Sequence, residues 1–356
     1  MCQQLKELRE FIVSDEFPED ARIGIVMHDN PDPDAIASAL GMSRILKSWR
    51  PNLKCIYLHG GDINRSQNKT MVNVLNITLS TMPPAPAEEI QGLAEYFITV
   101  DVMPERCLPE NVNCLLAVDH HKVETQRAKW SDIRLMGATA SIIWDYFQQE
   151  GIELDPQKDD DVTIATALVA GIRTDTNEMN TENVTDLDFE AYKHLMSLVN
   201  RKHLSVIMDY PISPNVLKLR SQLDKEENVR EENGVFVGGV GFIPESQREA
   251  LPMLAQERAR IEGIETAFVF AIVNDNIEVS VRSVGVSFDV PSLCKKIFSA
   301  GKNGTYGGGK MGAAAAKVPM DFLAVGNASP ESQQKMYDAV KSLLMERIFS
   351  IMSETV

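Results

Sequence analysis

The chain alternates short apolar runs with segments that have helical periodicity. In the first half, four apolar runs have the length of strands: 22–27, 54–59, 96–101 and 114–119. Between and after these runs, apolar residues recur at helical spacing in 34–48, 65–75, 139–150 and 160–172. Alternation of strand and helix is typical of βαβ units. We therefore predict an α/β domain with a mostly parallel sheet that is flanked by helices.

The pattern changes after a polar segment at 201–233, which we interpret as a linker with a linker helix. Beyond it, three apolar runs resemble hairpin strands, at 234–242, 266–274 and 276–285. We then expect a helix, a glycine-rich loop and a closing helix, at 291–299, 301–312 and 330–350. The sequence thus predicts a first domain at 1–200 and a smaller α+β domain at 234–356, with an active-site cleft between them.

Composition narrows the classes of partner. The chain has 356 residues and a formal net charge of −16, which argues against a long nucleic-acid duplex as the main partner. A short anionic ligand stays compatible, because bound cations can reverse the local charge. The five cysteines include no CxxC pair, which favours a reducing cytoplasm. No signal-peptide region and no apolar run near the roughly 18 residues of a membrane helix is found. We therefore expect a soluble, cytoplasmic protein without a membrane partner.

The stretch "MHDNPDPDAIAS" supplies the first candidate chemistry, at the end of the first predicted strand. Asp32 could simply cap the following helix, with Pro33 at its first position and Asp34 near its positive end. That interpretation leaves His28 unexplained. On this stretch alone, a helix start and a metal site both stay open.

Other predicted elements end in the same residue types. Asp101 ends one strand, Asp119 ends another and is followed by His120 and His121, and Asp175 follows an apolar helical run. The carboxyl ends of parallel strands meet at one sheet edge, where so many carboxylates would repel one another unless cations neutralised them. Mixed imidazole and carboxylate ligands suit a first-row divalent ion such as Mn²⁺ better than Ca²⁺ or a structural zinc.

These motifs, in this order, resemble the DHH phosphoesterase family with its DHH-associated C-terminal domain. The resemblance covers nearly the whole chain and rests on "HDNPDPDAIAS", "VDVMPER", "AVDHHK" and "GIRTDT", with "GDINRSQN" and "GATASIIWDYF" in support. One departure is Pro33, which stands between two aspartates where the family usually has glycine or a similar residue.

The resemblance implies two divalent metal ions, with Mn²⁺ as the first expectation and Mg²⁺ or Co²⁺ as alternatives. It assigns one ion to His28, Asp32 and Asp101, and the other to Asp34, Asp101, His120 and Asp175, so that Asp101 bridges them. It places His121 against the substrate phosphate or the attacking water. We expect Asp119 to orient the histidines or to support the metal ligands. The implied reaction is attack of a metal-activated water on phosphorus.

Two arginines lie in family-like segments of the first domain. Arg65 and Arg106 are therefore candidates to neutralise the charge of a substrate phosphate. The alternative is that each is an ordinary solvated surface arginine.

The second domain contains "GKNGTYGGGKMGAAAAK", which matches the first part of a P-loop. Met311 stands where a hydroxyl should reach Mg²⁺, so we reject hydrolysis of nucleoside triphosphates. As a loop that opens an alanine-rich helix, this segment could hold an anion through backbone N–H groups. A loop that only permits tight packing is the alternative.

The same segment resembles the family's GGGH loop, which implies substrate contacts from Gly307, Gly308, Gly309 and residue 310. Lys310 replaces the usual histidine, which keeps a positive charge but puts recognition of a nucleobase in doubt. Arg282 and Ser283, in "VSVRSVG", are further implied substrate contacts, although Arg282 could be an ordinary edge-strand charge.

Within the family, the chain resembles the branch that degrades short oligoribonucleotides and nucleoside bisphosphates such as 3′-phosphoadenosine-5′-phosphate. The implied function is that of a metal-dependent phosphoesterase for small phosphorylated substrates. Two alternatives stay open. One is hydrolysis of inorganic pyrophosphate or polyphosphate, and the other is a non-catalytic regulator that binds nucleotides. The sequence does not determine the oligomeric state, for which a homodimer is one candidate.

Overall fold

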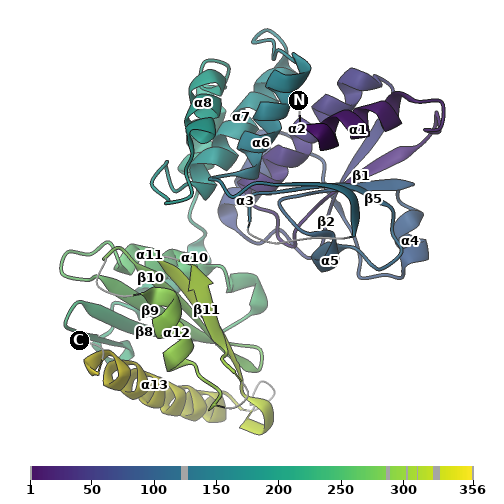
Figure 1. Cartoon of the computed structure of the whole chain (residues 1–356). Coiled ribbons are helices and arrows are strands. Elements are labelled where there is room, and N and C mark those ends of the chain that lie inside the picture. The colour runs from purple at the N-terminus through teal and green to yellow at the C-terminus, as the bar shows by residue number, and fades with distance from the viewer. Residues whose placement is uncertain are drawn as a thin grey trace. The chain divides into compact units, whose positions relative to one another are not determined.

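The computed structural model describes residues 2–121, 127–285, 289–301, 304–310, 312–323 and 329–354. The chain forms two compact units, Met1–Pro211 and Ile212–Val356 (Figure 1). Their boundary falls within 201–233, the segment for which the sequence predicts a linker.

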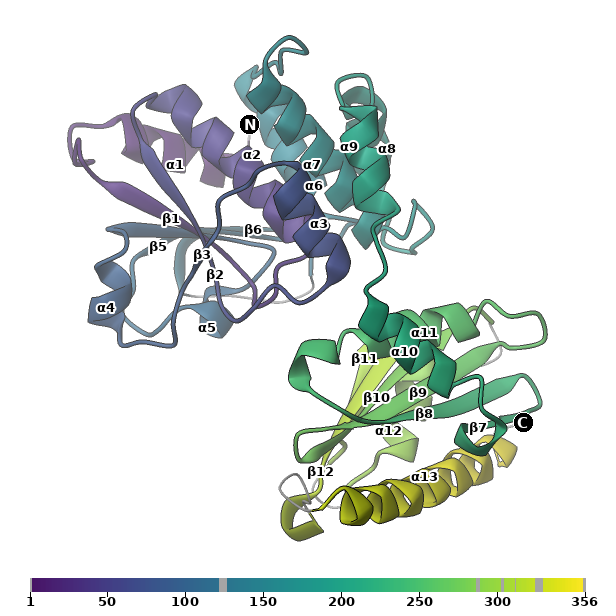
Figure 2. The same ribbon diagram turned by 180° about the vertical axis from the view of Figure 1, so that it is seen from behind.

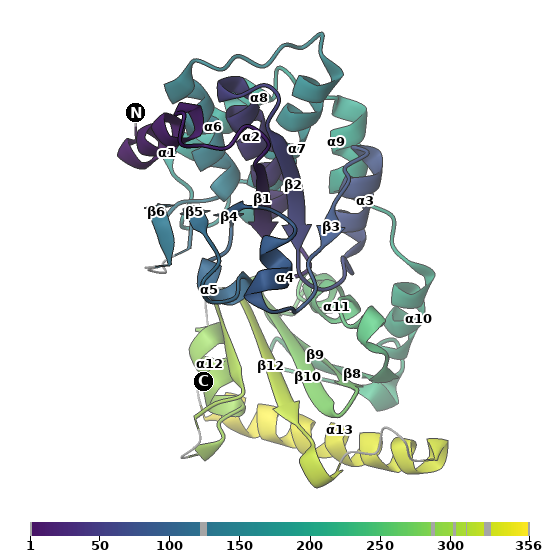
Figure 3. The same cartoon turned by 90° about the vertical axis from the view of Figure 1, so that its right-hand side faces the viewer.

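The first unit is built on a six-stranded sheet in which all strands are parallel, as predicted. The strand order is β3-β2-β1-β4-β5-β6, which can be followed across Figure 3. The strands are β1 (Arg22–Met27), β2 (Lys54–His59), β3 (Ser80–Thr81), β4 (Tyr96–Val100), β5 (Cys114–Asp119) and β6 (Ala128–Ile133). The chain leaves β1 in one direction to form β2 and β3 and returns to form β4 on its other side. This reversal is the switch point at which sheets of this order bind ligands.

Helices cover both faces of this sheet. On one face, apolar side chains of β1, β4 and β5 pack against α1, α2, α6 and α7 in the main core. On the other, a smaller core joins Val26, Leu58 and Phe97 to Ile90 of α4 and to Leu108. The helices are α1 (Gln3–Val13), α2 (Pro33–Trp49), α3 (Ser66–Val74), α4 (Ala87–Gln91), α5 (Pro104–Cys107), α6 (Thr139–Glu150), α7 (Asp159–Asp175), α8 (Asp186–Leu195) and α9 (Arg201–Met208).

The second unit is the α+β structure that the sequence predicts. Its sheet has the order β11-β12-β10-β9-β8-β7 and is antiparallel except for the β8–β9 pair. Helices α12 and α13 pack on one face, and α10 and α11 on the other (Figure 2). The strands are β7 (Val229–Glu232), β8 (Val235–Ile243), β9 (Thr266–Val273), β10 (Asn276–Ser283), β11 (Gly307–Lys310) and β12 (Ala313–Pro319). The helices are α10 (Pro214–Gln222), α11 (Ala250–Arg258), α12 (Val290–Ile297) and α13 (Pro330–Ser353).

The glycine-rich segment corrects one prediction. The expected loop that opens an alanine-rich helix is wrong, because Gly307–Lys310 and Ala313–Pro319 pair as antiparallel strands. Along β12, Ala314 and Ala316 are buried whereas Ala315 and Lys317 are exposed, which is the period of a strand. Packing of this two-residue pattern overrides the intrinsic helix preference of alanine. There is therefore no helix N-terminus here to bind an anion, and residues 302–303 and 311 of the expected loop lie outside the described residues.

None of the helices in the described parts of the chain combines the length and the apolar character needed to cross a bilayer. All five cysteines are free thiols.

Helix α7 passes very close to the start of α2, and a glycine permits this approach. A Cβ at Gly171 would lie 2.9 Å from the Cα of Asp34 and 3.1 Å from the carbonyl oxygen of Pro33. These are backbone atoms of the segment that begins α2, so they cannot move aside as a flexible side chain would.

We expect Gly171→Ala to lower the free energy of unfolding by about 1–3 kcal/mol, because overpacking forces the backbone to shift. This loss outweighs the advantage of about 1 kcal/mol that alanine has over glycine in a helix. Chemical denaturation measures the change, with Gly308→Ala as a control, since a Cβ at Gly308 meets nothing within 4 Å. An increase in stability for Gly171→Ala would contradict the close approach.

Candidate metal centre

The candidate residues of the first unit gather at the carboxyl edge of its sheet, beside the switch point between β1 and β4. His28 follows β1, Asp101 follows β4, and Asp119 is the last residue of β5. Asp175 is the last residue of α7, and Asp34 lies in the first turn of α2. The structure thus brings together all six residues to which the resemblance assigns metal ions.

His28, Asp32 and Asp101 form one group that could hold a metal ion. His28 Nε2 lies 3.8 Å from Asp32 Oδ1 and 3.7 Å from Asp101 Oδ2. Asp32 is also the N-cap of α2, as the simpler interpretation of the sequence predicts, because its Oδ1 accepts hydrogen bonds from the backbone N–H groups of Asp34 and Ala35. A helix cap and a metal ligand are therefore compatible roles for one carboxylate.

Asp34, His120 and Asp175 form a second group that could hold a metal ion. His120 Nε2 lies 3.0 Å from Asp175 Oδ2, and the other ring nitrogen, Nδ1, lies 2.9 Å from the carbonyl oxygen of Met136. Because a carbonyl only accepts, Nδ1 carries the proton and donates it. Nε2 is then the nitrogen that faces the group, and once its proton is displaced it can offer a lone pair to a metal ion.

Asp101 lies between these groups. Its Oδ1 is 3.5 Å from His120 Nε2, and its Oδ2 is the oxygen near His28. Its backbone has φ 58°, a left-handed conformation that aspartate tolerates better than most residues and that ends β4 at Val100. The expected strand 96–101 is therefore one residue shorter, because residue 101 turns out of the sheet.

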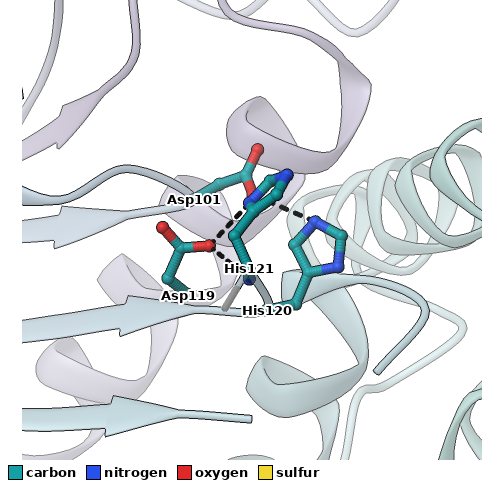
Figure 4. A group of neighbouring side chains, drawn as sticks. All are labelled: Asp101, Asp119, His120 and His121. Atoms are coloured by element: carbon teal, nitrogen blue, oxygen red, sulfur yellow. Dashed lines mark hydrogen bonds and ion pairs between the residues drawn. The ribbon is translucent and has the colours of Figure 1, made fainter. Parts of the chain in front are cut away.

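Asp119 and His121 lie beside Asp101 and His120, and these four side chains form a further group that could hold a metal ion (Figure 4). The Oδ1 of Asp119 accepts from the backbone N–H of His121 at 2.9 Å and from its ring Nδ1 at 2.8 Å. This double contact fixes the tautomer and leaves Nε2 of His121 available. The imidazole is 52% exposed, in contrast to the buried ring of His120.

Hydrogen bonds from the start of α6 hold the buried carboxylates. Asp34 is fully buried and accepts from the backbone N–H groups of Thr139 and Ala140, both at 2.8 Å. Asp101 accepts from the hydroxyl of Thr139 at 3.1 Å. The N-terminal end of a helix favours negative charge, so α6 stabilises Asp34 next to its neighbouring carboxylates.

The electrostatics indicate a cluster that retains protons. Burial, with the negative charge of Asp175, raises the pKa of Asp34 to about 8, and burial with the neighbouring carboxylates holds the pKa of Asp101 well above its usual range. Burial alone would lower the pKa of His120, but its contact with Asp175 and the charge of Asp34 raise it to about 9. Burial likewise opposes ionisation of Asp32, yet contact with His28 keeps the pKa of Asp32 below its usual range.

This donor set fits a divalent metal ion. His120 Nε2 and Asp175 Oδ2 are buried, face each other, and find no hydrogen-bond partner among the described residues. Two lone pairs at this distance need either a shared proton or a cation between them. Imidazole nitrogens mixed with carboxylate oxygens are the donors that suit first-row divalent ions such as Mn²⁺.

A pocket of about 380 Å³ opens beside the groups, within the first unit. Its polar side is formed by His28, Asp101 and His121, and Val102 and Met103 supply an apolar wall. Arg106, a candidate phosphate contact, is exposed and lines this pocket. Arg65 precedes α3, and its positive charge acts on both His28 and Asp32, which places it near the first group.

The remaining candidates belong to the second unit. Arg282 donates to the carbonyl oxygen of Val281 at 2.9 Å, and the hydroxyl of Ser283 donates to the carbonyl oxygen of Glu265 at 2.9 Å. Gly307, Gly308 and Gly309 lie in β11, the edge strand of its sheet. The side chain of Lys310 lies outside the described part of the structure. Nothing in the second unit tests these residues as substrate contacts, so they stay predictions.

Sequence reasoning missed the residues that support the ligands. Met136 and Thr139 act partly through backbone atoms, which leave no residue-type pattern, although "GATAS" marks the start of α6. Asp188 is a third, and its spacing from Thr185 has the form of a capping box, which could have revealed it.

Comparisons with known proteins identify the family of this chain. The profile of the DHH family, N-terminal domain, matches residues 22–172. The uncharacterized protein MJ1633 of Methanocaldococcus jannaschii is 31% identical over 349 residues, which cover 98% of this chain and 67% of that protein. The chain belongs to the DHH family.

Two further relatives are informative. A manganese-dependent inorganic pyrophosphatase of M. jannaschii is 26% identical over 272 residues, covering 70% of this chain and 82% of the relative. The crystal structure of an exopolyphosphatase-related protein from Bacteroides fragilis has a TM-score of 0.65 and 16% identity, covering 97% of this chain and 98% of that one. The latter likeness confirms the fold alone.

The retained protons lead to a prediction about pH. A metal ion must displace the protons that Asp34, Asp101 and His120 hold, so acid competes with metal. We expect the affinity for Mn²⁺ to increase between about pH 6 and pH 8, by up to roughly tenfold per pH unit for each displaced proton. Calorimetric titration in buffers of different ionisation enthalpy measures both the affinity and the protons released. An affinity that is the same across this range, without proton release, would show that the cluster is already deprotonated.

Proposed function

We propose that the chain is a divalent-metal-dependent phosphoesterase that hydrolyses small phosphorylated molecules. The observation that carries this proposal is the buried pair of ligand atoms His120 Nε2 and Asp175 Oδ2, which lie 3.0 Å apart at the switch point of the sheet. Membership of the DHH family supports the same conclusion. A regulator that only binds nucleotides would have little use for two adjacent groups of metal ligands.

Two ions, most simply Mn²⁺, would occupy the two groups, with Asp101 contributing to both. His28, Asp32 and Asp101 would hold one ion, and Asp34, Asp101, His120 and Asp175 the other. When bound, such ions lower the pKa of water and neutralise charge on a phosphoryl group. The chain's own residues then have to bind the substrate, orient it and handle protons.

His121 is the residue best suited to handle a proton. Its Nδ1 is committed to Asp119, which leaves Nε2 on an exposed ring that lines the pocket. From there it can donate to a phosphate oxygen or exchange a proton with the leaving group. Asp119 orients this imidazole and does not need to contact the substrate itself.

The arginines would contribute to substrate binding. Arg106 lines the pocket, where it can pair with a phosphate that the anionic cluster alone would repel. Arg65 supplies a second positive charge near His28 and Asp32. We retain Arg282, Ser283 and the glycines of β11 as further candidate contacts.

Two classes of substrate are candidates. Short oligoribonucleotides and nucleoside bisphosphates are favoured by the family branch that the sequence resembles, and the apolar wall of Val102 and Met103 suits an organic leaving group. Inorganic pyrophosphate is favoured by relatives that are named manganese-dependent inorganic pyrophosphatases.

The decisive experiment is a substrate panel with the full-length chain and Mn²⁺. It should contain pyrophosphate, a nucleoside bisphosphate and a dinucleotide, with phosphate or nucleotide release as the readout. We expect turnover of at least one of them, and its loss in Asp101→Ala, because that variant removes a ligand from both groups. If no substrate is turned over although Mn²⁺ binds, the regulator is the better interpretation.

A second variant separates proton transfer from metal binding. We expect His121→Ala to lower kcat by roughly 10²–10⁴-fold, the usual contribution of a general acid or base, without loss of Mn²⁺ affinity. His203→Ala is the matched control, since His203 belongs to none of the groups of potential metal ligands. Loss of Mn²⁺ binding in His121→Ala would instead identify His121 as a metal ligand.

A further inference from the structure

Asp188 is a fully buried carboxylate on α8 that contacts no candidate metal-ligand side chain in the described structure, yet it accepts four hydrogen bonds. Its Oδ2 accepts from the backbone N–H of Thr185 at 2.8 Å, which is the contact expected of a capping box at the start of α8. A cap needs no more than this, and most caps lie at the surface. The other contacts of Asp188 therefore require a different explanation.

These other contacts lead to the segment that supports the metal centre. The backbone N–H of Gly137 donates to Asp188 Oδ2 at 3.1 Å, and the hydroxyl of Ser141 donates to Asp188 Oδ1 at 2.6 Å. Both donors lie in the segment 136–141, some fifty residues before Asp188 in the chain. Asp188 thus fastens the start of α6 to α8.

One peptide group connects Asp188 to His120. The N–H of Gly137 and the carbonyl of Met136 belong to the same planar peptide unit, and that carbonyl accepts from His120 Nδ1 at 2.9 Å. A carboxylate at the N–H end strengthens the carbonyl as an acceptor, since linked hydrogen bonds polarise one another. The orientation of the His120 ring, and hence of Nε2, depends on where this peptide is held.

Packing leaves this peptide little freedom. A Cβ at Gly137 would lie 2.8 Å from Asp188 Oδ2 and 2.7 Å from a methyl carbon of Thr176, the neighbour of Asp175. Residues 139 and 140, directly beyond the peptide, donate to Asp34. The segment 136–141 thus bonds to His120 and to Asp34, and it lies against Thr176, which follows Asp175.

We propose that Asp188 is a positioning residue of the second metal group, which acts on His120 through the Met136–Gly137 peptide and on Asp34 through the start of α6. This inference rests on the proposed function, because it presupposes that Asp34, His120 and Asp175 bind a metal ion. Outer contacts of this kind fix the ring orientation of a ligating histidine, and their removal costs roughly 10–100-fold in metal affinity.

The test is a comparison of Mn²⁺ affinity among full-length variants, measured by calorimetry and by electron paramagnetic resonance of free Mn²⁺. We expect Asp188→Ala to weaken binding of one ion by roughly 10–100-fold. Asp188→Asn should be intermediate, since its amide oxygen can accept from Gly137 and its NH₂ can donate to Ser141. The melting temperature of each metal-free variant is recorded in parallel.

Two control variants separate this role from a purely structural one. Thr185→Ala removes the hydroxyl that caps α8 and donates to Asp188 Oδ2 at 2.8 Å, but it leaves the contacts of Asp188 with Gly137 and Ser141. It should therefore lower the melting temperature and weaken Mn²⁺ binding much less than Asp188→Ala does. Asp186→Ala removes an exposed carboxylate from the same helix turn and should change neither quantity. If Thr185→Ala weakens Mn²⁺ binding as much as Asp188→Ala does, the proposal is wrong and Asp188 only stabilises α8.

The remaining outcomes are also decisive. If Asp188→Ala does not fold, Asp188→Asn and Ser141→Ala are measured in its place. Wild-type Mn²⁺ affinity in both of these variants would overturn the proposal. Wild-type affinity in a folded Asp188→Ala would do the same while leaving the proposed function intact. If the wild-type chain itself binds no Mn²⁺, the proposed function fails, and this inference fails with it.

Discussion

Several carboxylates lie close together at one edge of the sheet of the first unit and repel one another. The structure there depends on the interactions that offset this repulsion. Asp32, Asp34, Asp101 and Asp175 lie within a few side-chain lengths of one another, and burial weakens the screening that water would give. Such an arrangement persists only where positive charge or donated hydrogen bonds offset it. The chain supplies part of this from two helix N-termini, α2 at Asp32 and α6 at Asp34. Protons supply the rest in the metal-free protein, and divalent ions can replace them.

The sheet order determines where this charge collects. The strand order reverses after β3, so β4 lies next to β1 on the side away from β2. The loops that follow β1 and β4 therefore run to opposite faces of the sheet, which leaves space between these two loops. His28 and Asp101 begin these loops, and the tight approach of α7 at Gly171 brings α2 and its aspartates beside Asp175. The fold thus converts residues that are far apart in sequence into one compact set of ligands.

Much of the first unit could be predicted from sequence, because its strands are continuous apolar runs that end in chemically distinctive residues. The strands at 22–27, 54–59 and 114–119 have the expected bounds, and α6 has the expected range. Strands β3 and β6 were not predictable in this way, since one has two residues and the other, AKWSDI, has little apolar character. The alanine segment of β12 was assigned wrongly because its strand period is visible only when the burial of Ala314 and Ala316 is known. The ligand residues were recognisable by type, whereas the supports of His120 and Asp34 are backbone groups and could not be.

If both groups bind metal ions as proposed, the position of Asp101 determines how the two sites influence each other as they fill. One of its oxygens lies near His28 and the other near His120, so a single carboxylate serves both groups. An ion that enters one group fixes the charge and the rotamer of Asp101 for the other. The two affinities are then linked by a coupling free energy, and each ion changes the affinity for the other by the same factor. Occupancy of this centre is therefore a property of the pair, and its metal titration departs from that of independent sites.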